Sequence, residues 1–168
     1  MGKLPDLCDE PNAAYRAAMR IALYQPEIAG NVGAVMRLGA CLGVAVDLIE
    51  PLGFSWDDKR VRRTAMDYID HVEVVRHPNF AAFEATFGGA RMILLSTRAR
   101  DSLYDFAFAP DDILLFGQES AGVPAAVAAQ CDAVLKIPIR EAVRSLNLAT
   151  SVAIALGEAL RQTGGLPN

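Results

Sequence analysis

Short apolar runs alternate with segments of helical period along almost the whole chain. Strands are predicted at Ile21–Gln25, Val44–Ile49, Val72–Val75, Met92–Ser96, Asp111–Phe116 and Val134–Ile139. Helices are predicted at Val32–Leu42, Lys59–Met66, Phe80–Phe87, Ala125–Gln130 and Leu146–Leu160. Several strands are apolar at nearly every position, which is typical of strands buried on both faces. The alternation predicts an α/β domain with a mostly parallel sheet and helices on both faces.

The length of 168 residues suits one domain, which we expect over residues 21–164, preceded by an N-terminal arm of unassigned role over residues 1–20. Apolar residues make up 52% of the chain, yet no apolar run reaches the roughly 18 residues of a membrane span. No secretory signal is recognisable at the N-terminus. The cysteines Cys8, Cys41 and Cys131 lack CxxC spacing, so we expect reduced thiols, the latter two buried in helices, in a cytoplasmic protein.

The charge balance bears on nucleic-acid binding in two opposite ways. The net charge of −4 argues mildly against a dedicated nucleic-acid binder, because contacts with phosphates need cations. Lys59, Arg60, Arg62 and Arg63, however, put four cations into five residues. From composition alone this segment is either a solvated helix face or a phosphate-binding patch.

Common catalytic motifs are missing from the sequence. His71 and His77 have no partner at metal-ligand spacing, so we expect no metal site. The run Glu119–Gly122 matches part of the G-x-S-x-G hydrolase elbow, but Gln118 stands where the first glycine belongs, and no histidine follows His77. Neither G-x-G-x-x-G nor a Walker sequence occurs, so the chain lacks the usual nucleotide-binding motifs.

Polar residues that follow the predicted strands are the best candidates for a binding site. In Ile137–Leu148, Ser145 and Asn147 are predicted to open the last helix, where they either cap it or receive ligand oxygens. Asn31 and Arg37 lie in an otherwise apolar helix, where the arginine either only snorkels or contacts, with Asn31, one phosphate or ribose. Since ligands collect at the carboxyl ends of parallel strands, these segments are expected to meet in one crevice.

Three segments, Gly30–Arg37, Leu115–Pro124 and Ile137–Leu148, together resemble the signature segments of the SPOUT class of RNA methyltransferases. The resemblance covers about residues 21–162 and is closest to the small bacterial enzymes that methylate the wobble ribose of tRNA. It includes Tyr24–Ile28, Ile49–Arg60 and Met66–Tyr68. It implies a deep C-terminal trefoil knot (the α/β-knot) within about Met92–Leu160, S-adenosyl-L-methionine as cofactor, tRNA as partner, no metal, and a homodimer whose sites are completed by the partner.

The resemblance also implies roles for individual residues. The catalytic set falls on Asn31, Arg37, Glu119, Ser145 and Asn147. Backbone groups that hold the cofactor fall on Leu95, Gly117, Ile137, Ser145 and Leu146. Gln118 and Ala121 depart from the family's usual proline and arginine, which leaves substrate detail open.

Arg37 is the family's proposed activator of the ribose hydroxyl, either as a base or as a clamp. Because a guanidinium is a very weak base, we favour a clamp that grips phosphate and stabilises the developing oxyanion.

The function that follows is S-adenosylmethionine-dependent methyl transfer to the ribose 2′-hydroxyl of the wobble nucleotide, cytidine or 5-modified uridine, of tRNA. The alternatives are a 2′-O-methyltransferase of another tRNA or rRNA position, and a non-catalytic RNA-binding module on the same fold. The complete set of candidate residues favours the enzyme. The last helix is apolar on more than one face, so we expect it to be buried all round, by a dimer contact or by the monomer core.

Overall fold

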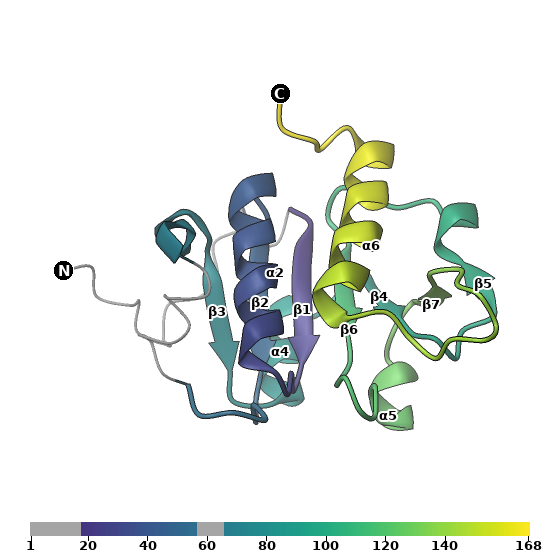
Figure 1. Cartoon of the computed structure of the whole chain (residues 1–168), viewed down its shortest axis with the longest axis horizontal. Coiled ribbons are helices and arrows are strands. Elements are labelled where there is room, and N and C mark those ends of the chain that lie inside the picture. Colours follow the sequence, from purple (N-terminus) through teal and green to yellow (C-terminus); the bar gives the residue numbers. More distant parts are fainter. Residues whose placement is uncertain (1–17, 57–65) are drawn as a thin grey trace.

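The computed structural model describes residues 18–56 and 66–168, which build one seven-stranded sheet with helices on both faces (Figure 1). The strand order is β3-β2-β1-β6-β4-β7-β5, and every strand pairing in this sheet is parallel. The strands are β1 (Arg20–Tyr24), β2 (Ala45–Ile49), β3 (Val74–His77), β4 (Met92–Leu95), β5 (Asp101–Ser102), β6 (Ile113–Phe116) and β7 (Ala133–Lys136). The predicted α/β class with a parallel sheet is confirmed.

The helices form two layers, one on each face of the sheet. They are α2 (Ala29–Leu42), α4 (Phe80–Phe87), α5 (Ala125–Ala128) and α6 (Leu148–Thr163), with short 3-10 turns η1 (Met66–His71) and η2 (Leu103–Asp105). Helices α2 and α6 lie side by side over one face and share a core cluster with it, whereas α4 and α5 pack against the opposite face (Figure 1).

Helix α6 is buried mainly along one side. Its fully buried positions are Leu148, Val152, Ala155, Leu156, Ala159 and Leu160, which recur at helical spacing and pack against the sheet and α2. Ala153 on the other side is exposed, and Ile154 is half-buried. The monomer core therefore takes most of its apolar side chains, and burial of the other side by a dimer contact stays a prediction.

Most element boundaries agree with the sequence pattern to within two or three residues. Helix α4 matches the prediction, while α2 begins at Ala29 rather than Val32 and α6 at Leu148 rather than Leu146. Strand β5 and turn η2 were not predicted, because each has only two or three residues. The predicted basic helix Lys59–Met66 lies outside the described residues except at its end, where Met66 opens η1.

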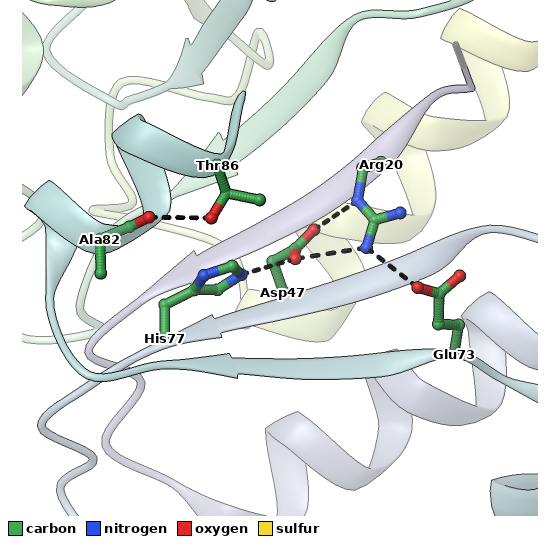
Figure 2. A network of polar contacts seen from close by, with 6 residues as sticks. All are labelled: Arg20, Asp47, Glu73, His77, Ala82 and Thr86. Atoms are coloured by element: carbon green, nitrogen blue, oxygen red, sulfur yellow. Dashed lines mark hydrogen bonds and ion pairs between the residues drawn. The ribbon is translucent and has the colours of Figure 1, made fainter. Parts of the chain in front are cut away.

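A buried polar network ties the three strands at one side of the sheet together (Figure 2). Asp47 on β2 is fully buried and accepts bonds from Arg20 Nε on β1 at 2.7 Å and Nη2 at 3.3 Å. His77 Nε2 on β3 lies 2.8 Å from the same carboxylate. A buried carboxylate is tolerated only when it is paired and hydrogen-bonded in this way. The network therefore supports the packing of β1, β2 and β3.

Two cysteines differ from the sequence expectation. Cys41 does lie in α2 but is exposed, because it points away from the sheet. Cys131 follows α5 instead of lying in a helix and is half-buried. Burial raises the pKa of the Cys131 thiol to about 11, so it stays protonated at neutral pH and is a poor nucleophile. Cys8 lies outside the described residues.

The topology brings four strand ends together at one edge of the sheet. Strands β1, β6, β4 and β7 are neighbours, with Leu23 and Leu95 both in register with Phe116 and Leu95 in register with Leu135. The loops that follow these strands, together with the starts of α2 and α6, therefore lie along the lower edge in Figure 1. Such an edge, where the chain leaves neighbouring strands in opposite directions, is where open α/β sheets bind ligands. Among the described residues, no helix is long and apolar enough to cross a membrane.

Candidate functional site

A cavity of about 760 Å³ opens at this edge, between the loops that follow β4, β6 and β7 and the starts of α2 and α6. The five residues predicted to hold a cofactor all line it, namely Leu95, Gly117, Ile137, Ser145 and Leu146. Leu95 ends β4, and Gly117 directly follows β6, so the sheet itself fixes their backbones. The volume lies within the roughly 300–1,000 Å³ of ordinary small-molecule sites.

The wall next to β6 is a tight turn that glycine makes possible. The backbone N–H of Gln118 donates to the carbonyl of Gly122 at 2.9 Å, and the N–H of Gly122 donates back to Gln118 at 2.9 Å. A Cβ at Gly117 would lie 2.4 Å from the carbonyl carbon of Gly122, and Gly122 itself has a φ of 72°. The lack of a side chain at Gly117 is thus required to close the turn.

The three signature segments are joined by one chain of hydrogen bonds. Asn31 on α2 is buried, and its Nδ2 donates to Glu119 Oε1 at 2.9 Å. Asn147 Nδ2 in turn donates to Asn31 Oδ1 at 2.8 Å. An ionised carboxylate only accepts, so Glu119 fixes which side of the Asn31 amide faces it, and the Asn31 oxygen then fixes the orientation of Asn147. The loop after β6, the start of α2 and the start of α6 therefore form one polar unit.

The start of α6 differs from the prediction by two residues. Asn147 is the N-cap, and its Oδ1 accepts from the backbone N–H of Thr150 at 3.3 Å. Ser145 lies two residues before this cap in an exposed stretch of loop and does not open the helix. Both residues line the cavity, so Asn147 serves at once as a helix cap and as part of the site.

Arg37 is the one predicted catalytic residue that does not line the cavity. It is exposed on α2, and its guanidinium lies over the ring of Tyr68 in η1, 4.8 Å from the ring centroid. A residue six positions further along a helix lies about 9 Å along the axis and about 120° around it. Asn31 and Arg37 accordingly face different neighbours, and their contact with one common phosphate or ribose stays a prediction.

A second set of contacts joins the loop after β1 to the loop after β6. The carboxylate of Glu27 accepts from the Ser120 hydroxyl at 2.7 Å and from the Ser120 backbone N–H at 2.8 Å. In return, the Glu27 backbone N–H donates to Glu119 at 2.9 Å. Gln118 Nε2 donates to Gln25 at 3.0 Å. Glu27 was not among the predicted site residues, because nothing in the sequence pattern shows that β1 and β6 are neighbours.

Two further arginines, Arg98 and Arg144, line the cavity. Both are exposed, and no acid among the described residues forms an ion pair with either. Glu119 is the sole carboxylate in the described lining, and two donors already satisfy it. The cavity is thus locally basic in an acidic protein. Arg98 lies in the loop after β4, and this position after a strand end could have identified it as a candidate site residue from the sequence.

Comparisons with known proteins show the family of this chain. The model of the SpoU rRNA methylase family matches residues 18–157. A relative from Beijerinckia indica, named tRNA (cytidine(34)-2'-O)-methyltransferase, is 54% identical over 148 residues, which cover 87% of this chain and 92% of the relative.

Solved structures are similar over the same region. One from work on the 2-OH methylation of C/U34 on tRNA is 45% identical with a TM-score of 0.81, covering 88% of this chain and 97% of that one. AviRb of Streptomyces viridochromogenes in complex with AdoMet is 25% identical with a TM-score of 0.78, covering 95% of this chain and 62% of AviRb. With the family model matching from before β1 into α6, the chain belongs to the SpoU rRNA methylase family.

Proposed function

We propose that the protein is an S-adenosylmethionine-dependent methyltransferase of the ribose 2′-hydroxyl at the wobble position of tRNA. The observation that carries the proposal is the convergence of the three signature segments on one cavity, joined through Asn31, Glu119 and Asn147. The relatives named above support the choice of tRNA and of nucleotide 34. The enzyme acts in the cytoplasm, where its tRNA substrate is found.

The cavity fits the proposed cofactor in size and in the kind of groups that line it. Much of its wall is loop backbone next to small or apolar residues, such as Gly117, Ile137 and Leu146, so that N–H and C=O groups are available to read an adenine edge. When bound, S-adenosylmethionine supplies an electrophilic methyl group with a good leaving group, which calls for no metal. The family fold also implies the trefoil knot within Met92–Leu160, and the loops of this region that line the cavity would be the knot loops.

The chain's own residues then align the reaction and handle charge. Asn31 and Asn147, held by Glu119, present fixed amides at the cavity wall for the ribose, while Ser145 lies in the adjoining loop. Arg98 and Arg144 give the cavity a positive potential that suits the phosphates flanking the target nucleotide. Arg37 is the clamp for the phosphate and the developing oxyanion.

A homodimer accounts for the position of Arg37. The side chain lies outside the cavity of its own chain and packs on Tyr68, whereas Asn31 on the same helix contacts Asn147. We infer a two-fold dimer, in which each chain presents the same surface to the other and Arg37 of one chain lies at the cavity of its partner. Tyr68, against which the guanidinium packs, would hold it in the required orientation.

Cofactor binding is the first test, since it separates an enzyme from a non-catalytic RNA-binding module. Titration calorimetry should show binding of S-adenosylmethionine and of its demethylated product at one site per chain, with the same affinity in EDTA. Within the described residues no group of three or more His, Cys, Asp or Glu side chains is arranged to hold a metal. Binding that disappears in EDTA and returns with magnesium would contradict the proposal.

The basic cluster Lys59, Arg60, Arg62 and Arg63, which lies outside the described residues, is proposed to bind tRNA phosphates. Replacing all four residues with glutamine should weaken tRNA binding and lower the slope of log K against log salt by up to about 3 or 4, because fewer counterions are released. Titrations at several salt concentrations measure the slope, and cofactor affinity is the internal control. An unchanged slope would mean that the cluster is only a solvated surface.

A further inference from the structure

The loop after β1 and the loop after β6 contact each other through a reciprocal pair of bonds. The side chain of Glu27 accepts a hydrogen bond from the backbone N–H of Ser120. The side chain of Glu119 accepts one from the backbone N–H of Glu27. Each loop thus uses a carboxylate to hold the other loop's main chain. Charge-assisted bonds of this type are roughly twice as strong as neutral ones.

The Ser120 hydroxyl strengthens the contact, because it donates to the second Glu27 oxygen at 2.7 Å. Donation by the hydroxyl and by the backbone N–H of Ser120 holds the pKa of the Glu27 carboxyl below its ordinary value. The carboxyl is therefore ionised at neutral pH, and both of its oxygens accept from Ser120. Gly53 packs so closely on Glu27 that a Cβ there would lie 2.7 Å from the Glu27 Cα, which fixes the backbone from the other side.

The residues that this contact fixes are those of the proposed site. Ser120 directly follows Glu119, and Glu119 orients the Asn31 amide, which orients Asn147 at the start of α6. Glu119 and Ser120 both line the cavity, whereas Glu27 does not. A movement of the Ser120 backbone would shift the Glu119 carboxylate and, with it, both amides.

We propose that Glu27 and Ser120 are positioning residues, which hold Glu119 so that the Asn31 and Asn147 amides face the substrate in one orientation. The inference rests on the proposed function and adds two residues that the family comparison does not single out. Neither residue needs to touch the ribose or the cofactor to act. The glutamate acts through Ser120 and Glu119.

Four variants and a control test the proposal. Glu27→Ala removes both acceptors, whereas Glu27→Gln keeps a neutral acceptor and donor of the same shape. Ser120→Ala removes the hydroxyl, whereas Ser120→Thr keeps it. Glu158→Ala is the matched control, because Glu158 accepts comparable bonds from Arg161 and Gln162 at the far end of α6, away from the cavity.

We expect Glu27→Ala to lower kcat/KM for tRNA at least about tenfold, because both charge-assisted bonds from Ser120 are lost, with Glu27→Gln in between and the control unchanged. Ser120→Ala should lower kcat/KM less than Glu27→Ala does, and Ser120→Thr, which keeps the hydroxyl, should have a kcat/KM near that of the wild type. In a Glu27→Ala background, Ser120→Ala should have almost no further effect, because the partner is already gone. Wild-type kcat/KM in folded Glu27→Ala, or additive effects in the double variant, would overturn the proposal.

Amide exchange gives a readout that does not depend on methyl transfer. The Ser120 amide should exchange about tenfold faster in Glu27→Ala than in the wild type, while the Gly122 amide, which bonds within its own turn, changes less. Unchanged exchange at Ser120 would overturn the positioning role even in an active enzyme. If the wild-type protein binds no cofactor, and the Ser120 amide still exchanges faster in Glu27→Ala, then only the proposed function is overturned.

Discussion

Arg37→Ala is expected to lower methyl transfer by a factor on the order of 10²–10³, the usual loss when one preorganised charge donor is removed from a transition state. Cofactor affinity should stay at the wild-type value, because Arg37 is proposed to act on the RNA phosphate and the developing oxyanion and not on the cofactor. Arg37→Lys should be nearly as poor, since an ammonium cannot replace a planar fork on phosphate. Single-turnover kinetics measures methyl transfer, and calorimetry measures cofactor affinity. Near-normal turnover of Arg37→Ala would show that Arg37 takes no part in transfer and only snorkels from an apolar helix.

The position of Arg37 also allows a test of where it acts. If the side chain serves the partner's cavity, Arg37→Ala protein mixed with a variant that cannot bind cofactor should regain activity, since each mixed dimer has one complete site. Random exchange of subunits would restore about one quarter of wild-type activity, because half of the dimers are mixed and each has one working site of two. Mixtures that stay inactive after subunit exchange would place Arg37 in its own chain's site.

Gly117→Ala is expected to abolish measurable cofactor binding. The new Cβ would lie 2.4 Å from the carbonyl carbon of Gly122 and 2.6 Å from its Cα, and both atoms belong to backbone that two hydrogen bonds hold in place. The turn must open, which removes the wall formed by residues 117–122. Overpacking of this kind costs about 1–3 kcal/mol in folding stability as well.

The control for Gly117→Ala is Gly157→Ala in α6, where a Cβ would meet nothing within 4 Å. Alanine has the higher helix propensity, so this variant should be neutral or up to about 1 kcal/mol more stable. Calorimetry with cofactor and thermal unfolding followed by circular dichroism measure both variants. Wild-type cofactor affinity in Gly117→Ala would show that the turn is not part of the cofactor site.

Local pattern was enough to predict the fold class and most of the elements. Helix α4 and strands β1, β2 and β4 follow from apolar runs and turn residues that lie close together in sequence. The two-residue strand β5 has no such pattern and exists because it can pair with β7. The order of the strands could not be predicted either, since the adjacency of β1 and β6 depends on packing between segments about 90 residues apart.

The same division applies to the candidate site. Residues directly after strand ends, such as Gly117 and Ile137, were predicted and do line the cavity, because parallel strands end at a common edge. Glu27 was missed, since its partner Ser120 is a neighbour only through the sheet order. The contacts of Arg37 could not be predicted either, because the spacing from Asn31 does not show that Arg37 packs on Tyr68 whereas Asn31 bonds to Glu119.

The most direct test of the whole account is mass spectrometry of tRNA after incubation with purified protein and S-adenosylmethionine carrying a labelled methyl group. The account predicts one labelled methyl group per tRNA, on the ribose 2′-oxygen of nucleotide 34, with no transfer by the Arg37→Ala variant. Labelled methyl at another tRNA or rRNA position, or on a base, would contradict the proposed substrate. No transfer at all, by a protein that binds tRNA, would identify a binding module in place of an enzyme.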